Sequence, residues 1–184
     1  MLPPHTQVIG LSCSCSNSKQ PVRTHLDGPL TILQAGRVSP EKGAHVTIEP
    51  LGRLARQGVT DVQLFVAGTG PTEHAQRLRE IAERCRIADR VTFLGWRPRA
   101  EVPTIMARSH VLVLPTEGQE PFARVVLEAM ASGLTVVSTL TGGTSEIVRH
   151  GETGLTFPLG NTGGPVDWLD WLRYIEDRFD GLLR

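Results

Sequence analysis

The sequence lacks an excess of charge of either sign. Lys plus Arg and Asp plus Glu each number 19 among 184 residues, so the formal net charge at pH 7 is zero. A balanced chain creates no broad field that would attract nucleic acid or an acidic lipid surface. We therefore expect no nucleic-acid partner, and any anionic ligand must be bound by a local cluster of cations.

Cysteine is also scarce, with Cys13, Cys15 and Cys85 only. Three cysteines form no disulfide framework, and a Cys-x-Cys pair is too closely spaced for an ordinary metal knuckle. The six histidines are scattered and show no H-E-x-x-H spacing. These absences predict no metal site, and the cysteine usage is typical of a cytoplasmic protein, at most peripheral to a membrane.

Long hydrophobic runs are absent as well. No apolar run approaches the roughly 18 residues of a membrane span, and the N-terminus has no basic start followed by an apolar stretch, as a signal peptide would. A G-x-S-x-G elbow of the hydrolase type is missing too. The hydrophobic fraction of 40% nevertheless predicts a folded core.

The chain divides into a short leader and one domain. Residues 1–28 mix proline, serine and polar residues without periodicity, which indicates a poorly ordered leader or a remnant of something larger. Residues 29–184 are expected to form one domain that ends in a helix. The expected strands are 30–35, 62–67, 91–94, 111–114, 134–138 and 154–157, and the expected helices are 42–57, 72–85, 100–108, 121–133 and 144–149.

This alternation of strand and helix predicts the fold class. The strands are short, and the fourth is continuously apolar, as strands covered on both faces are. We therefore expect an α/β protein with a Rossmann-like, doubly wound parallel sheet. In such a sheet, ligands bind at the carboxyl ends of the strands, so the loops that follow each strand are the informative ones.

Two cations follow the first expected strand, Arg37 and Lys42. A guanidinium offers a two-pronged contact to phosphate oxygens, and an ammonium adds a compact charge. In a chain without net charge, this pair fits a diphosphate. The structural alternative is that Arg37 pairs with Glu41 and that both cap the next helix; the sequence favours neither.

A second candidate for anion binding is the loop with Gly142, Gly143 and Thr144, which precedes an expected helix. Free N–H groups at a helix start, together with the helix dipole, attract anions. The alternative is ordinary capping by Thr144 or Ser145, with Glu146 in the first turn. Because caps are commoner than binding sites, the motif alone favours capping.

Glu120 and Glu128 form the most informative pair of carboxylates. They are eight positions apart in a segment that reads as a helix between Pro121 and Gly133. Eight helical residues turn through about 800°, so both carboxylates project from roughly one face, two turns apart. One ligand that carries two hydroxylated rings could contact both.

The motif Gly68-Thr69-Gly70-Pro71 begins like a dinucleotide-binding fingerprint, but Glu73 follows where the third glycine would be expected. An isolated G-x-G is a weak signal, so we interpret it as a turn. A nicotinamide-dependent oxidoreductase would therefore be supported by the strand-helix alternation alone.

Taken together, these loops resemble the donor-binding half of the family 4 retaining glycosyltransferases, which have the two-domain GT-B fold. The resemblance covers about residues 30–160, and each motif is modest by itself. The motifs stand in family order: Gly36-Arg37, Glu41-Lys42-Gly43, Val66 to Pro71, Val91 to Trp96, Leu112 to Pro115, Glu120-Pro121-Phe122, Glu128 to Gly133, Gly142 to Glu146 and Gly151 to Gly154. One departure is Ala123, where the family usually has glycine.

The resemblance implies a role for each motif. Arg37 and Lys42 would bind the diphosphate of a nucleoside diphosphate sugar, and Glu128 would bind the ribose. Glu120 would hold the hydroxyls of the donor sugar. The loop formed by Gly95, Trp96 and Arg97 would line the base pocket, and the loop formed by Gly142, Gly143 and Thr144 would contribute its helix N-terminus. The family transfers the sugar with retention of configuration and needs neither a metal nor a separate cofactor.

The resemblance also implies a part that the sequence does not supply. Family members have an N-terminal domain that binds the acceptor, whereas about 29 residues precede the first strand here. An absent N-terminal domain or a partner subunit would complete the enzyme, and the acceptor is unknown. An apolar stripe from Trp168 to Phe179 would pack on this domain or on a partner. The alternative function is a non-catalytic binding or assembly module derived from a glycosyltransferase.

Overall fold

A computed structural model describes residues 28–118 and 124–158 of the chain. Three predicted features lie outside the described residues. They are the leader, the segment with Glu120 and Ala123, and the apolar stripe from Trp168 to Phe179. The predictions that concern them stay predictions.

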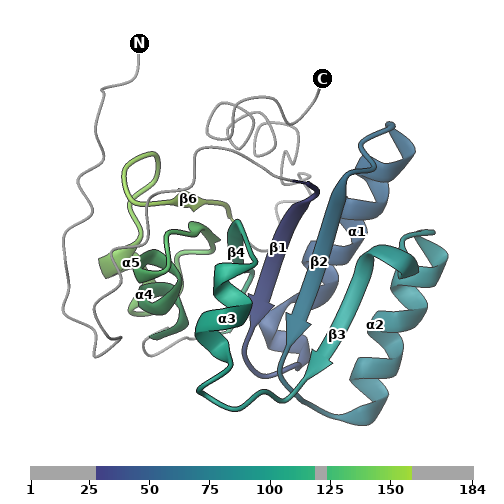
Figure 1. The fold of residues 1–184 in the computed structure, drawn as a ribbon, viewed down its shortest axis with the longest axis horizontal. Coiled ribbons are helices and arrows are strands. Elements are labelled where there is room, and N and C mark those ends of the chain that lie inside the picture. The colour runs from purple at the N-terminus through teal and green to yellow at the C-terminus, as the bar shows by residue number, and fades with distance from the viewer. Residues whose placement is uncertain (1–27, 119–123, 159–184) are drawn as a thin grey trace.

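Six strands form a single parallel sheet (Figure 1). The strands are β1 (Leu30–Ala35), β2 (Val62–Ala67), β3 (Val91–Gly95), β4 (Val111–Leu114), β5 (Thr135–Ser138) and β6 (Leu155–Thr156). Their order across the sheet is β3-β2-β1-β4-β5-β6, and every neighbouring pair is parallel. The chain therefore starts in the middle and winds first one way and then the other, with the switch between β1 and β4.

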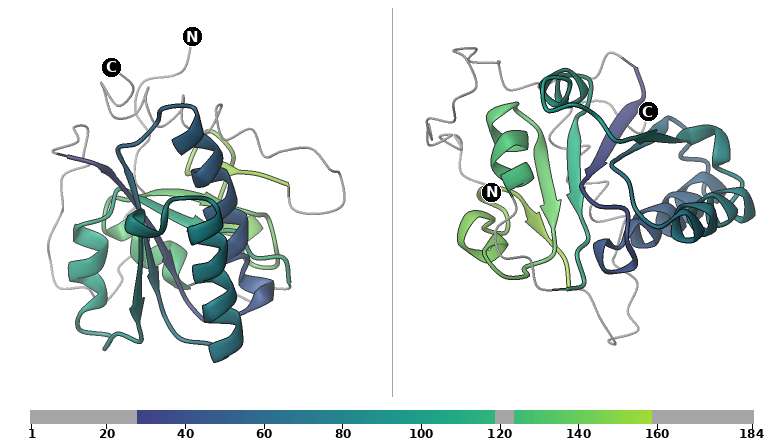
Figure 2. Two further views of the ribbon diagram at one scale, coloured as in Figure 1. Left: turned by 90° about the vertical axis from the view of Figure 1, so that its right-hand side faces the viewer. Right: turned by 90° about the horizontal axis from the view of Figure 1, so that it is seen from below.

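Helices cover both faces of this sheet, as the two views of Figure 2 show. The helices are α1 (Ala44–Arg56), α2 (Thr72–Arg84), α3 (Val102–Ala107), α4 (Arg124–Ala131) and α5 (Thr144–Ile147), with short 3-10 helices at Pro40–Lys42 and Ala88–Arg90. The helices α1 and α2 lie on one face, and α3 and α4 lie on the other.

Two hydrophobic clusters fill the space between the sheet and the helices. Because side chains alternate along a strand, Leu30 and Ile32 of β1 are buried in the cluster with Ile48 of α1, whereas Leu33 is buried with Met106 of α3 and Val126 of α4. A central strand that is apolar on both faces is what a doubly wound sheet requires. The predicted fold class is thus confirmed.

The start of α1 differs from the sequence prediction. The expected helix began at Lys42, whereas the chain forms a 3-10 turn over Pro40–Lys42 and enters α1 at Ala44. Gly43 separates the two with a φ of 66°, a left-handed conformation that ends one helix and redirects the chain. Lys42 therefore stands in a tight turn at the end of the sheet and not on the helix itself.

Within residues 28–118 and 124–158, no helix combines the length and the apolar character that a membrane crossing requires.

Candidate functional site

A cavity opens at the point where the strand order reverses. It has a volume of about 340 Å³, within the range typical of small-molecule sites. Its wall is formed by the ends of β1, β2 and β4, the loop after β1 and the start of α4: Gln34, Ala35, Gly36, Arg37, Val38, Lys42, Ala44, Val66, Ala67, Leu114, Arg124, Val125 and Glu128. This is the crevice in which doubly wound proteins bind their ligands.

The predicted cation pair lies at this cavity. Arg37 and Lys42 both line it, with Arg37 exposed and Lys42 half-buried. A buried side chain of β1 fixes the backbone of Lys42, because the side-chain amide of Gln34 donates a hydrogen bond to the Lys42 carbonyl at 2.8 Å. The Thr47 hydroxyl in turn donates to the side-chain amide oxygen, Oε1, of Gln34 at 3.3 Å. This support could not be predicted from the sequence, because Gln34 reads as one polar residue in an apolar strand.

The geometry also bears on the alternative role of Arg37. Glu41 accepts a hydrogen bond from the Ser39 hydroxyl at 2.7 Å, and this bond, aided by a backbone N–H and by the nearby charges of Arg37 and Lys42, lowers the pKa of Glu41. Among the ion pairs within 4 Å that join described residues, none links Arg37 to Glu41. Arg37 therefore does not form the predicted ion pair with Glu41, and it lines the cavity.

The loops after β1 and β4 interlock beside the cavity. The Glu117 N–H donates to the Glu41 carbonyl at 2.8 Å, and the His45 ring lies 3.5 Å from the Glu117 carboxylate. A methyl group on Gly43 would overlap the Pro115 carbonyl oxygen, so only glycine allows the two loops to approach this closely. These contacts fix the turn that carries Lys42.

The G-x-G motif after β2 has a structural role of the same kind. The Val38 N–H donates to the Thr69 carbonyl at 2.9 Å, and a methyl group on Gly70 would overlap the Val38 carbonyl oxygen. The motif forms the bend and loop that follow β2, and because Gly70 has no side chain this loop can lie against the loop that carries Arg37.

Glu128 lines the cavity from α4, together with Arg124 one turn earlier. Sequence reasoning missed Arg124, because it treated this residue as part of a helix and considered cations only in the loops. Neither residue makes an ion pair within 4 Å with another described residue. The cavity thus has three cations and one carboxylate in its described wall.

The loop with Gly142, Gly143 and Thr144 lies at the carboxyl end of β5, the same edge of the sheet. The N–H groups of Thr144, Ser145 and Glu146 donate to the carbonyls three residues earlier, at 3.2–3.3 Å. Gly143 is the N-cap residue of the four-residue α5, and no side chain caps this helix. Within the described part of the chain, the cavity wall does not include this loop. Its anion-binding role stays a prediction.

The loop with Gly95, Trp96 and Arg97 follows the edge strand β3. Gly95 accepts the Gly68 N–H at 2.8 Å, Trp96 is 69% exposed, and Arg97 pairs with Glu101 at 3.6 Å. The described wall of the cavity does not reach this loop either, so its contact with a base stays a prediction.

Several buried hydroxyls lie at or after the ends of β4 and β5, and of these the sequence analysis had named only Thr144. Their oxygen atoms are shielded from solvent and have no hydrogen-bond partner among the described residues: Thr116, Ser138, Thr141 and Thr144. No sequence motif distinguishes such hydroxyls from ordinary capping residues, because only the fold brings the two loops together. Among the described residues, His, Cys, Asp and Glu form no group of three that could hold a metal ion.

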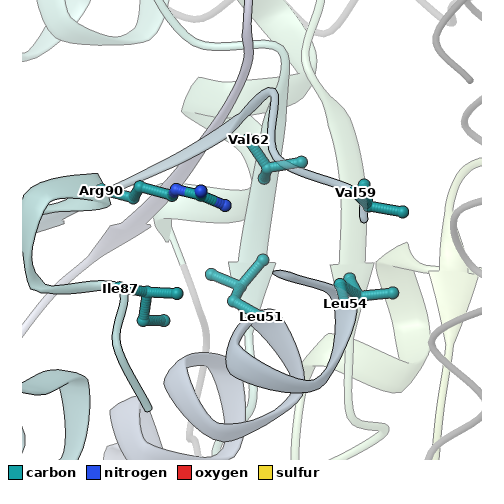
Figure 3. A pocket seen from close by; sticks show the side chains of 6 residues that line it. All are labelled: Leu51, Leu54, Val59, Val62, Ile87 and Arg90. Carbon is teal, nitrogen blue, oxygen red and sulfur yellow. The ribbon is translucent and has the colours of Figure 1, made fainter. Parts of the chain in front are cut away.

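A second hollow has no such chemistry (Figure 3). Leu51, Leu54, Val59, Val62 and Ile87 surround it with Arg90, and its volume is only about 10 Å³, room for about one water molecule. It lies at the start of β2. The cavity, in contrast, lies at the carboxyl ends of the strands.

Comparison with known proteins shows that the chain is similar to glycosyltransferases. The chain is 35% identical over 130 residues to the putative glycosyltransferase YtcC of Bacillus subtilis, which covers 67% of this chain and 31% of that protein. The fold resembles the crystal structure of Anabaena Alr3699/HepE in complex with UDP, with a TM-score of 0.70, 27% identity, and coverage of 82% of this chain and 40% of that one. The same protein has been crystallised with UDP-glucose.

A third similarity identifies the part of the fold. The crystallised C-terminal domain of the glycosyl transferase group 1 family protein LpcC from Francisella tularensis matches with a TM-score of 0.66 at 22% identity, over 80% of this chain and 76% of that one. The implied fold, the C-terminal half of a GT-B protein, is therefore confirmed. The chain spans about a third of the length of the curated relatives it matches. The family model described as glycosyl transferases group 1 matches residues 17–167, and the chain belongs to that family.

Proposed function

We propose that this chain is the donor-binding domain of a glycosyltransferase and binds a nucleoside diphosphate sugar. The observation that carries the proposal is the cavity at the strand switch, where Arg37 and Lys42 stand together with the carboxylate of Glu128. Cations suit a diphosphate. A carboxylate suits a ribose, because its oxygens can accept hydrogen bonds from the two ribose hydroxyls. HepE, crystallised with UDP and with UDP-glucose, supports a ligand of this class.

The proposed chemistry follows from the charge that develops during transfer. The bond between the sugar's anomeric carbon and the phosphate oxygen breaks, and the nucleoside diphosphate leaves with the electron pair. The acceptor hydroxyl forms the new bond to the anomeric carbon, and its proton passes to the leaving phosphate. Arg37 and Lys42 stabilise the growing negative charge, so no metal ion is needed for this task.

The finer parts of the proposal come from the family resemblance. Transfer proceeds with retention of configuration, and Glu120 holds the hydroxyls of the donor sugar. The loop at Gly95–Arg97 contacts the base, and the loop at Gly142–Thr144 contributes the N–H groups of Gly142 and Gly143. The acceptor binds to a part of the enzyme outside the described domain, supplied by another domain or by a partner subunit.

The test is calorimetric titration of the purified chain with UDP, GDP and ADP in the absence of metal ions. We expect saturable binding of at least one nucleotide. The Arg37→Ala variant should lose about 1.5–3 kcal/mol of binding free energy, the value of a charged hydrogen bond. A matched control is Arg53→Ala, an exposed arginine in the last turn of α1. Equal affinity of both variants and the unmodified chain would remove Arg37 from the site.

A further inference from the structure

Arg124 is a third cation of the cavity, and it comes from a different wall. Arg37 and Lys42 stand on the loop after β1, which leads to α1 on one face of the sheet. Arg124 is the first residue of α4, which packs on the other face, as Figure 2 shows. A ligand in the crevice between β1 and β4 would therefore have cations on both sides.

The position of Arg124 relative to Glu128 is the second observation. The two residues are four apart on α4, so their side chains lie on one face of the helix, one turn apart. A pair with this spacing could neutralise itself. Neither side chain, however, makes an ion pair within 4 Å with another described residue, and Arg124 is exposed. Its guanidinium is available to a ligand.

The location also carries an electrostatic conflict that an anion would relieve. The first turn of a helix bears partial positive charge, which disfavours a cation there. The first described turn of α4 contains Arg124 and no acidic residue. An anion bound beside it would interact favourably both with the guanidinium and with the helix end.

We propose that Arg124 binds the diphosphate of the donor, opposite Arg37 and Lys42, and thereby closes a three-cation clamp. This inference rests on the proposed function of the cavity. If Glu128 holds the ribose, the diphosphate attached to that ribose lies nearby, and Arg124, one helical turn from Glu128 in the wall of the same cavity, is placed to reach it. A guanidinium contacts two phosphate oxygens at once, which an ammonium cannot do.

The experiment compares nucleoside diphosphates with the corresponding monophosphates. UDP and UMP, GDP and GMP, and ADP and AMP are titrated into the unmodified chain and into the Arg124→Gln and Arg124→Lys variants. We expect Arg124→Gln to weaken the diphosphate that binds by roughly tenfold to a hundredfold and to weaken the monophosphate much less. The Lys variant should fall between, because it keeps the charge and loses the two-pronged contact.

The control is Arg56→Gln, an exposed arginine at the far end of α1, which should bind like the unmodified chain. Thermal unfolding of each variant verifies that the fold is intact. Unchanged diphosphate affinity in Arg124→Gln would overturn the proposal, and so would equal losses for diphosphate and monophosphate, which indicate a general distortion. If the unmodified chain binds no nucleotide at all, it is the proposed function that fails.

Discussion

Glu128 is the residue whose role can be tested most finely. It lines the cavity from α4 as the carboxylate among three cations, and we propose that it accepts hydrogen bonds from the ribose hydroxyls. Glu128→Ala should weaken binding of a nucleoside diphosphate by about 1.5–3 kcal/mol. It should weaken binding of the 2′,3′-dideoxy analogue very little, because that ligand has no hydroxyls to donate.

Calorimetry with both ligands measures this difference, and Glu83→Ala, an exposed residue near the end of α2, is the control. If the Glu128 variant lost the same free energy with both ligands, the ribose assignment would be wrong.

The environment of His74 makes the stability of the fold depend on pH. Burial of its ring, followed by the charges of His45 on α1 and Arg77 on α2, lowers the pKa of His74 below the ordinary value of 6.5, while Glu41 acts in the opposite direction. The native state therefore binds this proton less readily than the unfolded chain does. Stability is consequently lost as the pH falls below about 6.5, and it is retained above that value.

The measurement is thermal unfolding at intervals between pH 7 and pH 5. We expect the melting temperature of the unmodified protein to fall over this range and that of His74→Gln to fall less. Glu41, whose pKa is lowered from 4.5, titrates below this window and does not interfere. Parallel curves for the two proteins would contradict the assignment to His74.

At the scale of elements, the loop after β2 supports the loop that carries Arg37. Gly70 lies against the Val38 carbonyl so closely that a methyl group would overlap it. Gly70→Ala must therefore displace one of the two backbones, and we expect both a lower melting temperature and weaker nucleotide binding. Calorimetry and thermal unfolding measure the two effects.

A matched control is Gly118→Ala in the loop after β4, where a methyl group would make only ordinary contacts with other described residues, the nearest 3.6 Å from Glu41. That variant should unfold and bind like the unmodified protein. If Gly70→Ala did the same, the supporting role of the loop would be wrong.

The elements show how far the sequence could predict the structure. The bounds of β1, β2 and β4 were predicted exactly, because short apolar runs end at glycine or proline. The turn at Pro40–Lys42 was not predicted. It ends at the left-handed Gly43, which packs so closely on Pro115, a residue far away in the sequence, that a Cβ would not fit. Long-range packing of this kind leaves no local pattern.

The sequence predicted only part of the site, because some of its residues are brought together by long-range packing. Arg37, Lys42 and Glu128 follow strands or occupy a recognisable helix face, and the structure brings all three to one cavity. Arg124 and Gln34 became apparent only when the strand order placed α4 and the end of β1 side by side. Glu120 lies outside the described residues, and its role stays a prediction.

At the scale of the whole molecule, the domain should bind the donor and yet transfer sugar slowly when assayed alone. The chain spans about a third of the length of its curated relatives, and we propose that the acceptor site belongs to another domain or subunit. Transfer to an acceptor should therefore be far slower than in an intact two-domain enzyme of the family. A radiolabelled-donor assay tests this, and comparable turnover by the isolated chain would contradict it.

The most direct test of the central claim is to locate the nucleotide on the domain. Backbone amide resonances of the labelled protein would be followed by NMR during titration with UDP, GDP and ADP. We predict saturable shifts for Gly36, Val38 and Lys42 at the cavity, and none for Leu54 and Val59 at the small hollow on the opposite edge of the sheet. Shifts confined to that opposite edge, or no shifts with any of the three nucleotides, would contradict the assignment of this cavity as the donor site.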